Sequence, residues 1–285
     1  AAYADQQVTA WGRRFRLGDS LPEVYAEADR IVGGILDRME AGDLGPDPML
    51  VIVADHGFTS FRRGVNLNNL LHELGYLKTK DDKPLSEFSG QMADLLLYAD
   101  WSRTKAYSMG LGKVFINLAG REPNGIVAPE DYDATVEAIR DDLLRLTNAD
   151  GQRIVTSAMR RDELFSGPWW QEGRATRIVH GEAIEVDHDG FADLFMGYAP
   201  YHRVAGSNTL GGLGSAAITD NEGQWSGDHV SVDPSHVPGV LFSNQVLAEP
   251  SDSGLIDIGP TVLQRYGIDV GATDMDGTPL TFTGN

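Results

Sequence analysis

The pattern of apolar and polar positions along the chain predicts helices that alternate with short buried strands. An unbroken apolar run at 49–54 stops at Asp55 and His56, which is typical of a strand buried on both faces of a parallel sheet. The stretch 20–42 before it repeats apolar residues at helical spacing behind a Ser-Leu-Pro-Glu capping box. A helix that leads into a buried strand predicts an α/β protein with a mainly parallel sheet.

Further elements follow from the same periodicities. Helices are predicted over 66–74, from Pro129 onward and over 257–266, and strands over 114–118, 154–159, 192–198 and 239–243. The glycine-rich stretch 206–214 is predicted to be a flexible loop, because a phosphate cradle would need a helix directly after it. The charged turns and the long interval between the motifs described below indicate an inserted subdomain at about 78–190, within one domain spanning 1–285.

Composition narrows the classes of function. The net charge of −19 argues against binding to a nucleic-acid duplex, which calls for a basic stripe. The absence of cysteine excludes disulfides, zinc–thiolate sites and a cysteine nucleophile. With no apolar run long enough for a membrane and no signal-peptide pattern, we expect a soluble protein without a membrane partner, and both cytoplasm and periplasm stay open.

Two separate motifs carry side chains that bind divalent metals. Asp55 and His56 follow the predicted strand at 49–54, and Gly227-Asp-His229 precedes the one at 239–243. Ligands of open α/β sheets bind beyond the carboxyl ends of the strands, so the fold could bring both motifs to one edge. Imidazole and carboxylate ligands together suit zinc or manganese. The alternatives are a polar turn at 55–57 and a solvent-exposed loop histidine at His229.

Beyond these motifs, the sequence resembles the alkaline phosphatase superfamily, in its type I phosphodiesterase/nucleotide pyrophosphatase branch. The likeness begins with Ala-Asp55-His56-Gly-Phe and the Val65-Asn-Leu-Asn segment that follows. It continues, in the family's order, through 100–107, 116–117, 120–123, 125–127, 129–130, 192–193, 226–229, 237–241 and 257–263. The resemblance implies an alkaline-phosphatase-like sheet sandwiched by helices.

The resemblance also implies a site with two divalent metal ions, zinc first and manganese as the alternative. It assigns Asp55 and His56 to one ion, and His229 with an Asp-x-x-x-His pair to the other. Asp5 matches the aspartate of that pair, but Thr9 stands where its histidine belongs, and a hydroxyl is a poorer zinc ligand than imidazole. The family's first strand and its nucleophilic Thr or Ser have no match here, so we expect them in an upstream segment that is missing from this chain.

The resulting prediction is a metal-dependent hydrolase of phosphodiesters or nucleotide pyrophosphates, with a small phosphoester as substrate. Arg62 and Asn66, in the loop after the first motif, are candidates for contact with substrate. One alternative is a catalytically silent binding or assembly protein on the same fold, which the threonine at position 9 favours. Another is a sulfatase or phosphomutase relative. A Ser-His-Asp hydrolase is disfavoured because the sequence contains no Gly-x-Ser-x-Gly elbow.

Overall fold

The structure is a computed structural model that describes residues 7–10, 13–88, 95–148, 150–166, 170, 174–179, 182–187, 190–223, 225–248, 253–273 and 275–283. The chain divides into two compact units. The first comprises Ala1–Val51, Ser243–Val246 and Thr283–Asn285, and the second comprises Ile52–Phe242 and Leu247–Phe282. The predicted inserted subdomain at about 78–190 within a single domain stays a prediction.

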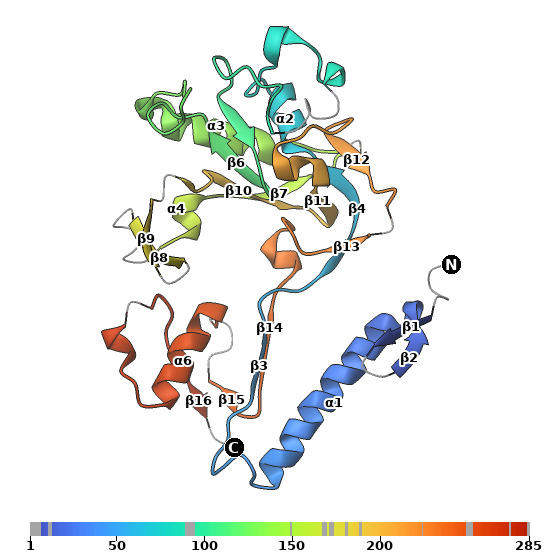
Figure 1. Ribbon diagram of the computed structural model, residues 1–285, viewed down its shortest axis with the longest axis vertical. Helices are drawn as coiled ribbons and strands as arrows, with labels where there is room; N and C mark the ends of the chain where they lie inside the picture. The colour runs from blue at the N-terminus through green and yellow to red at the C-terminus, as the bar shows by residue number, and fades with distance from the viewer. Residues whose placement is uncertain are drawn as a thin grey trace. The chain divides into compact units, whose positions relative to one another are not determined.

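The first unit is built from a hairpin and a long helix (Figure 1). Strands β1 (Gln7–Ala10) and β2 (Arg13–Arg16) pair antiparallel. Helix α1 (Ser20–Glu40) confirms the helix predicted over 20–42 and ends just before Gly42. Its cap position is held by Asp19, one residue earlier than the predicted capping box, because Ser20 already belongs to the helix.

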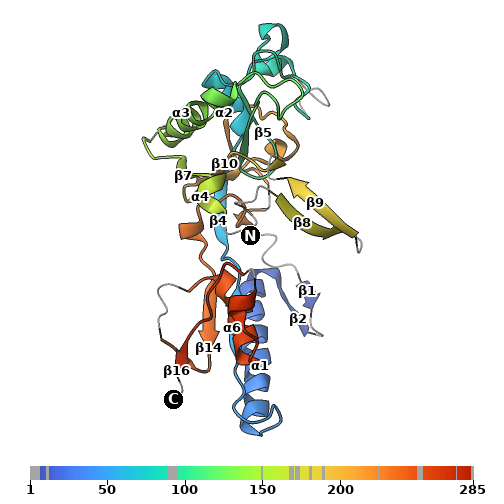
Figure 2. The same cartoon turned by 90° about the vertical axis from the view of Figure 1, so that its left-hand side faces the viewer.

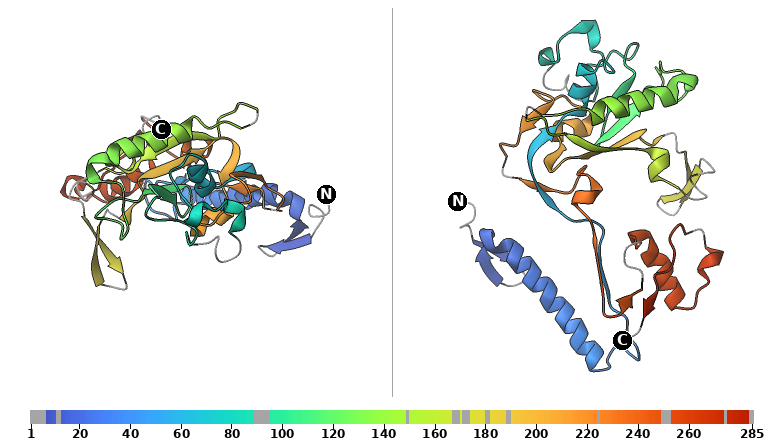
Figure 3. Two further views of the ribbon diagram at one scale, coloured as in Figure 1. Left: turned by 90° about the horizontal axis from the view of Figure 1, so that it is seen from above. Right: turned by 180° about the vertical axis from the view of Figure 1, so that it is seen from behind.

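The second unit contains a four-stranded sheet in the order β5-β6-β10-β7, with every pairing antiparallel. Its strands are β5 (Ala106–Ser108), β6 (Lys113–Ile116), β10 (Leu194–Tyr198) and β7 (Val155–Arg160). Helix α3 (Tyr132–Leu144) packs on this sheet, as Figure 3 shows from behind. Val136, Ile139 and Leu143, which are spaced one helical turn apart, are fully buried in the core.

A second sheet carries the strand that follows the Asp55-His56 motif. Strand β4 (Thr59–Val65) lies between β11 (Tyr201–Val204) and β12 (Ile218–Asp220), and its first residues pair with β13 (Gly227–Asp228). Helix α2 (Leu67–Glu73) follows at once, capped by the Asn66 side chain, which accepts a hydrogen bond from the Asn69 N–H at 3.0 Å. This arrangement confirms the short helix predicted over 66–74.

The remaining elements are short. Strand β3 (Val51–Ala54) pairs with β14 (Val240–Ser243), and β15 (Val246–Leu247) pairs with β16 (Phe282–Thr283). Helix α4 (Arg161–Leu164) follows β7, and α6 (Ile258–Arg265) matches the predicted last helix. Strands β8 (Arg174–Val179) and β9 (Glu182–Asp187) form a separate antiparallel ribbon (Figure 2).

The α/β class is confirmed, but the prediction of a mainly parallel sheet is wrong for the described residues. Its sandwiching by helices stays a prediction. Among the strand pairs whose register the structure gives, β11–β4 is parallel and the others are antiparallel. The β5–β6 connection shows one reason, because its few residues suffice for a hairpin and are too short for a parallel crossover.

Strand β3 also differs from its predicted burial on both faces. Val53 is 41% exposed, and no residue of the strand is fully buried. The physical reason is that β3 has one strand neighbour, β14, among the residues that the structure describes. An apolar, β-branched run predicts that a strand forms, whereas its burial depends on which other segments cover it.

Candidate functional site

The chain bends at Asp55, directly after β3, and Asp55 and His56 are exposed to solvent. The Asp55 carboxylate accepts a hydrogen bond from the His56 N–H at 3.1 Å, while its side chain stays 70% exposed. The Gly57 N–H donates to the Val237 carbonyl at 2.8 Å. A Cβ at position 57 would lie 2.9 Å from the Pro238 carbonyl oxygen, so this close approach of two backbones requires glycine.

A contact of Nδ1 with the backbone orients the ring of His56 and leaves Nε2 as its candidate metal-binding atom. Its Nδ1 lies 2.9 Å from the Gly57 carbonyl oxygen. A carbonyl oxygen only accepts, so Nδ1 is the donor in this contact, and Nε2 is the ring nitrogen left to bind a metal. The Asp55 Oδ2 lies 3.4 Å from that Nε2, which places a carboxylate oxygen and an imidazole nitrogen side by side.

The structure brings His229 onto His56. The two rings stack with centroids 3.8 Å apart and planes inclined by 10°. The centroid of the Phe58 ring lies 5.8 Å from that of the His229 ring. Strand β13 creates this proximity, because it pairs with the first residues of β4 and thereby sets His229 beside the turn that precedes β4.

Two residues that the sequence analysis did not select fix the position of His229. Asp228 is buried, accepts hydrogen bonds from the backbone N–H groups of His229 and Val230, and forms an ion pair with Arg203. The available signal in the sequence was weak, because the Asp-His dipeptide occurs at 55–56, 187–188 and 228–229. The neighbouring residues do not show which of these Asp-His dipeptides has an exposed aspartate and which has a buried one.

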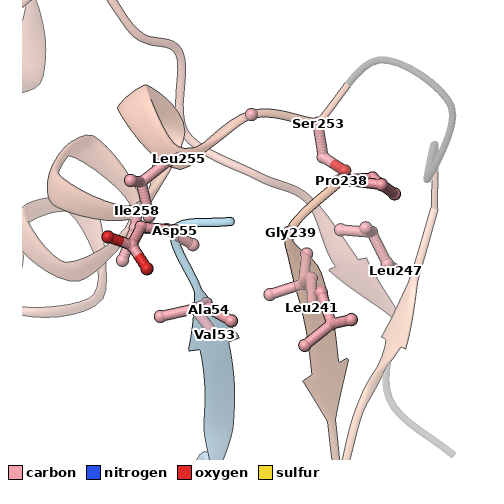
Figure 4. A pocket seen from close by; sticks show the side chains of 12 residues that line it. Val53, Ala54, Asp55, Pro238, Gly239, Leu241, Leu247, Ser253, Leu255 and Ile258 are labelled. Atoms are coloured by element: carbon pink, nitrogen blue, oxygen red, sulfur yellow. The ribbon is translucent and has the colours of Figure 1, made fainter. Parts of the chain in front are cut away.

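A cavity of about 470 Å³ opens beside Asp55 (Figure 4). Its walls come from the end of β3, the start of β14 and the segment that leads into α6. Aliphatic side chains line much of it, but its surface is at least as polar as apolar. The Asp55 carboxylate lies near the side chains of Leu255 and Ile258. Asp55 therefore borders both the histidine pair and this cavity.

The two predicted substrate contacts have different environments. Arg62 is exposed, and its guanidinium carbon lies 4.8 Å from the centroid of the Tyr201 ring, a cation–π contact that leaves it open to solvent. Asn66 is buried, and its amide nitrogen donates to Ser207 Oγ and to the Gly212 carbonyl, both at 3.0 Å. The glycine-rich stretch 206–214, predicted to be flexible, is thus tied to the start of α2. Asn66 has a structural role, and its contact with substrate stays a prediction.

The predicted ligand set is only partly assembled in the described residues. Asp55, His56 and His229 lie together, whereas Asp5 falls outside the described residues. Thr9 lies in β1 and is exposed. Within the described part of the chain, no group of three or more His, Asp or Glu side chains has an arrangement that could hold a metal ion. None of the helices described there has both the length and the hydrophobicity to span a lipid bilayer.

Comparison with known families shows to which family the chain belongs. A family model, type I phosphodiesterase/nucleotide pyrophosphatase, matches residues 9–182, which include Asp55 and His56 but end before His229. No curated protein and no solved structure matches the sequence. Because the match covers more than half of the 285 residues, the chain belongs to the type I phosphodiesterase/nucleotide pyrophosphatase family, a family of phosphoester hydrolases within the alkaline phosphatase superfamily.

Proposed function

We propose that this chain supplies metal ligands to a phosphoester hydrolase that acts on small phosphodiesters or nucleotide pyrophosphates. The observation that carries the proposal is the stacking of His56 on His229, at 3.8 Å between ring centroids. The two histidines come from motifs far apart in the sequence, and both motifs contain an aspartate next to the histidine. The proposal includes an alkaline-phosphatase-like arrangement of the catalytic domain.

The chemistry of the donor groups fits zinc, with manganese as the alternative. Asp55 and His56 would hold one metal ion and His229 would hold the other. The exposed carboxylate of Asp55, 3.4 Å from the His56 Nε2, supports this assignment. A zinc site needs three or four protein ligands, and the described residues contain no complete set. Asp5 is the further ligand that the family likeness suggests, and two ions are proposed in all.

The remaining groups of the site bind and orient. A bound divalent ion supplies charge that stabilises the phosphoryl oxygens during displacement. Asp55 and His56 present their donor atoms from a turn whose backbone is fixed by the Gly57–Val237 hydrogen bond. Arg62, exposed in a chain of net charge −19, is proposed to attract the anionic substrate. The nucleophilic hydroxyl is proposed to lie outside these 285 residues, because the family's motif for it has no match in them.

A second candidate is a relative that binds without turnover. Its support is Thr9, which stands in the place of a ligand histidine and weakens the proposed set. The alternative of a sulfatase or phosphomutase relative shares the same metal chemistry and differs in the group that is transferred.

The test is to measure bound metal by elemental mass spectrometry on the purified chain, after equilibration with zinc or manganese. Wild type is compared with Asp55→Ala and His229→Ala, and His72→Ala in α2 is the control that removes an imidazole elsewhere. The same samples are assayed with bis-p-nitrophenyl phosphate. We expect both site variants, and not the control, to lose metal.

The outcomes separate the candidates. Metal that both site variants lose supports one site built from the two motifs. Turnover by the chain alone would contradict the claim that the nucleophile lies elsewhere. Metal binding that persists without turnover when the upstream part of the domain is supplied would favour the silent relative. A folded wild-type protein that binds neither metal would overturn the proposed site.

A further inference from the structure

We propose that Asp228 and Arg203 are positioning residues that hold the His229 imidazole against His56. The function of this arrangement rests on the proposed two-metal site, in which His229 binds one ion next to the ion held by Asp55 and His56. The positioning of His229 is supported by the contacts of Asp228 and Arg203, which are not among the predicted metal ligands.

Asp228 fixes the backbone that carries His229. Its Oδ1 accepts the N–H of His229 at 2.8 Å and the N–H of Val230 at 3.1 Å. Its own backbone is aligned by the pairing of β13 with β4, in which Asp228 lies opposite Thr59. Asp228 is 6% exposed, so the carboxylate that accepts these hydrogen bonds is largely shielded from water, which strengthens its hold on the backbone at 228–230.

Arg203 in turn fixes the Asp228 carboxylate. Its Nη1 forms an ion pair with Asp228 Oδ2, and the two side chains are 18% and 9% exposed. The guanidinium carbon lies 4.8 Å from the centroid of the buried Phe61 ring, and Nε donates to the Val204 carbonyl at 2.9 Å. Arg203 comes from β11, so it links the strand on one edge of β4 to the short β13 on the other.

The ring of His229 needs this support more than the ring of His56 does. Metal-binding histidines usually donate their second ring nitrogen to a carbonyl or carboxylate, which orients the ring. His56 has such a bond, to the Gly57 carbonyl. Among the described residues, the ring of His229 contacts other rings but makes no hydrogen bond. Its orientation therefore depends on the anchored backbone and on stacking.

The first experiment records the histidine Cε1–Hε1 NMR signals of the metal-free full chain. The stacked pair is assigned with His56→Ala and His229→Ala, each of which removes the ring-current shift of the other histidine. We expect Asp228→Ala to abolish that shift as well. Asp228→Asn keeps an oxygen that accepts the backbone bonds but loses the charge that faces Arg203, so it should retain part of the shift. Arg203→Met should behave like Asp228→Asn.

The matched control is Asp257→Asn. Asp257 is also 6% exposed, and its carboxylate oxygens also accept two backbone N–H bonds, from Gly254 and Thr278, both at 2.8 Å. The substitution removes the same charge from an equally buried site and should leave the signals of the histidine pair unchanged. Unchanged signals in Asp228→Ala and Asp228→Asn, or an equal loss in the control, would overturn the proposal.

The second experiment titrates the same variants with zinc by calorimetry. We expect Asp228→Asn to weaken zinc binding roughly 10- to 100-fold, the range for residues that orient a metal ligand, while Asp257→Asn has the affinity of wild type. Zinc affinity that Asp228→Asn leaves unchanged would contradict the positioning role. If the wild-type chain binds no zinc but the NMR shifts respond as expected, the proposed function fails and the positioning of His229 stands.

Discussion

The two Asp-His pairs of the site share a local geometry but differ in environment. In each pair, the aspartate Oδ1 accepts the N–H of the following histidine, at 3.1 Å for Asp55 and 2.8 Å for Asp228. The Asp55 side chain is 70% exposed, whereas that of Asp228 is 9% exposed and is neutralised by Arg203. The same dipeptide can therefore offer a carboxylate to a ligand or bury it as an anchor, depending on what the fold packs against it.

The largest expected effect is on the stability of the metal-free protein, where loss of the buried Asp228 should matter more than loss of the exposed Asp55. Asp228→Ala leaves the Arg203 charge and two backbone N–H groups without their partner, so we expect a loss of about 3 kcal/mol, the lower end for a broken buried ion pair, since Arg203 keeps some contact with water. Asp55→Ala should cost less than about 1 kcal/mol, because its carboxylate is exposed. Urea unfolding in the presence of a chelator measures the loss of stability in both variants. Equal losses would show that the two aspartates do not differ in their structural role.

Substitution of Gly57 or Gly227, which flank the two Asp-His pairs, should give the next largest change in stability. A Cβ at position 57 meets backbone, the Pro238 carbonyl oxygen at 2.9 Å, so Gly57→Ala should cost about 1–3 kcal/mol. A Cβ at position 227 meets the edge of the Phe58 ring at 2.6 Å, but this ring is 61% exposed and can turn away. Gly227→Ala should therefore cost less than about 1 kcal/mol. Chemical denaturation ranks the two, and the reverse order would show that the turn after β3 is the more adaptable one.

The smallest expected effect is a pH dependence of stability that arises from Asp233, in the segment after His229. Burial tends to raise the pKa of Asp233, but hydrogen bonds from Ser235 and Thr156 outweigh it and lower the pKa to about 2. An ordinary aspartate in the unfolded chain has a pKa of about 3.9. The stabilisation is therefore complete above about pH 4 and is lost as the pH falls through about 2. The segment after His56 is held by the Gly57–Val237 backbone bond, which does not titrate.

The measurement is the difference in urea midpoint between wild type and Asp233→Asn at several pH values. We expect a constant difference from neutral pH down to about 4 and a shrinking one below it, because both proteins then carry a neutral side chain at this position. A difference that stays constant as the pH approaches 2 would show that the hydrogen bonds to Asp233 do not depend on its charge.

Local patterns were enough to predict most of the described α-helices but fewer than half of the described strands. The 3.6-residue spacing of apolar positions and the capping residues located α1, α2, α3 and α6, and short apolar runs located β3, β7, β10 and β14. The position of Asp55 and His56 directly after a strand was also visible, because the boundary between an apolar run and polar residues is a local property. Local sequence therefore indicated where several elements lie, to within a few residues at their ends, and which side chains are suited to a metal.

Tertiary structure alone decided how these pieces combine. Whether strands pair parallel or antiparallel depends on partners distant in the chain, so the run at 49–54 could not reveal that β3 would be half-exposed beside β14. The stacking of His56 on His229 requires β13 to pair with β4. The different environments of Asp55 and Asp228 arise because Arg203, from β11, reaches only the second of them. Identical dipeptides acquire different roles because burial and charge pairing are set by long-range contacts, which no local pattern encodes.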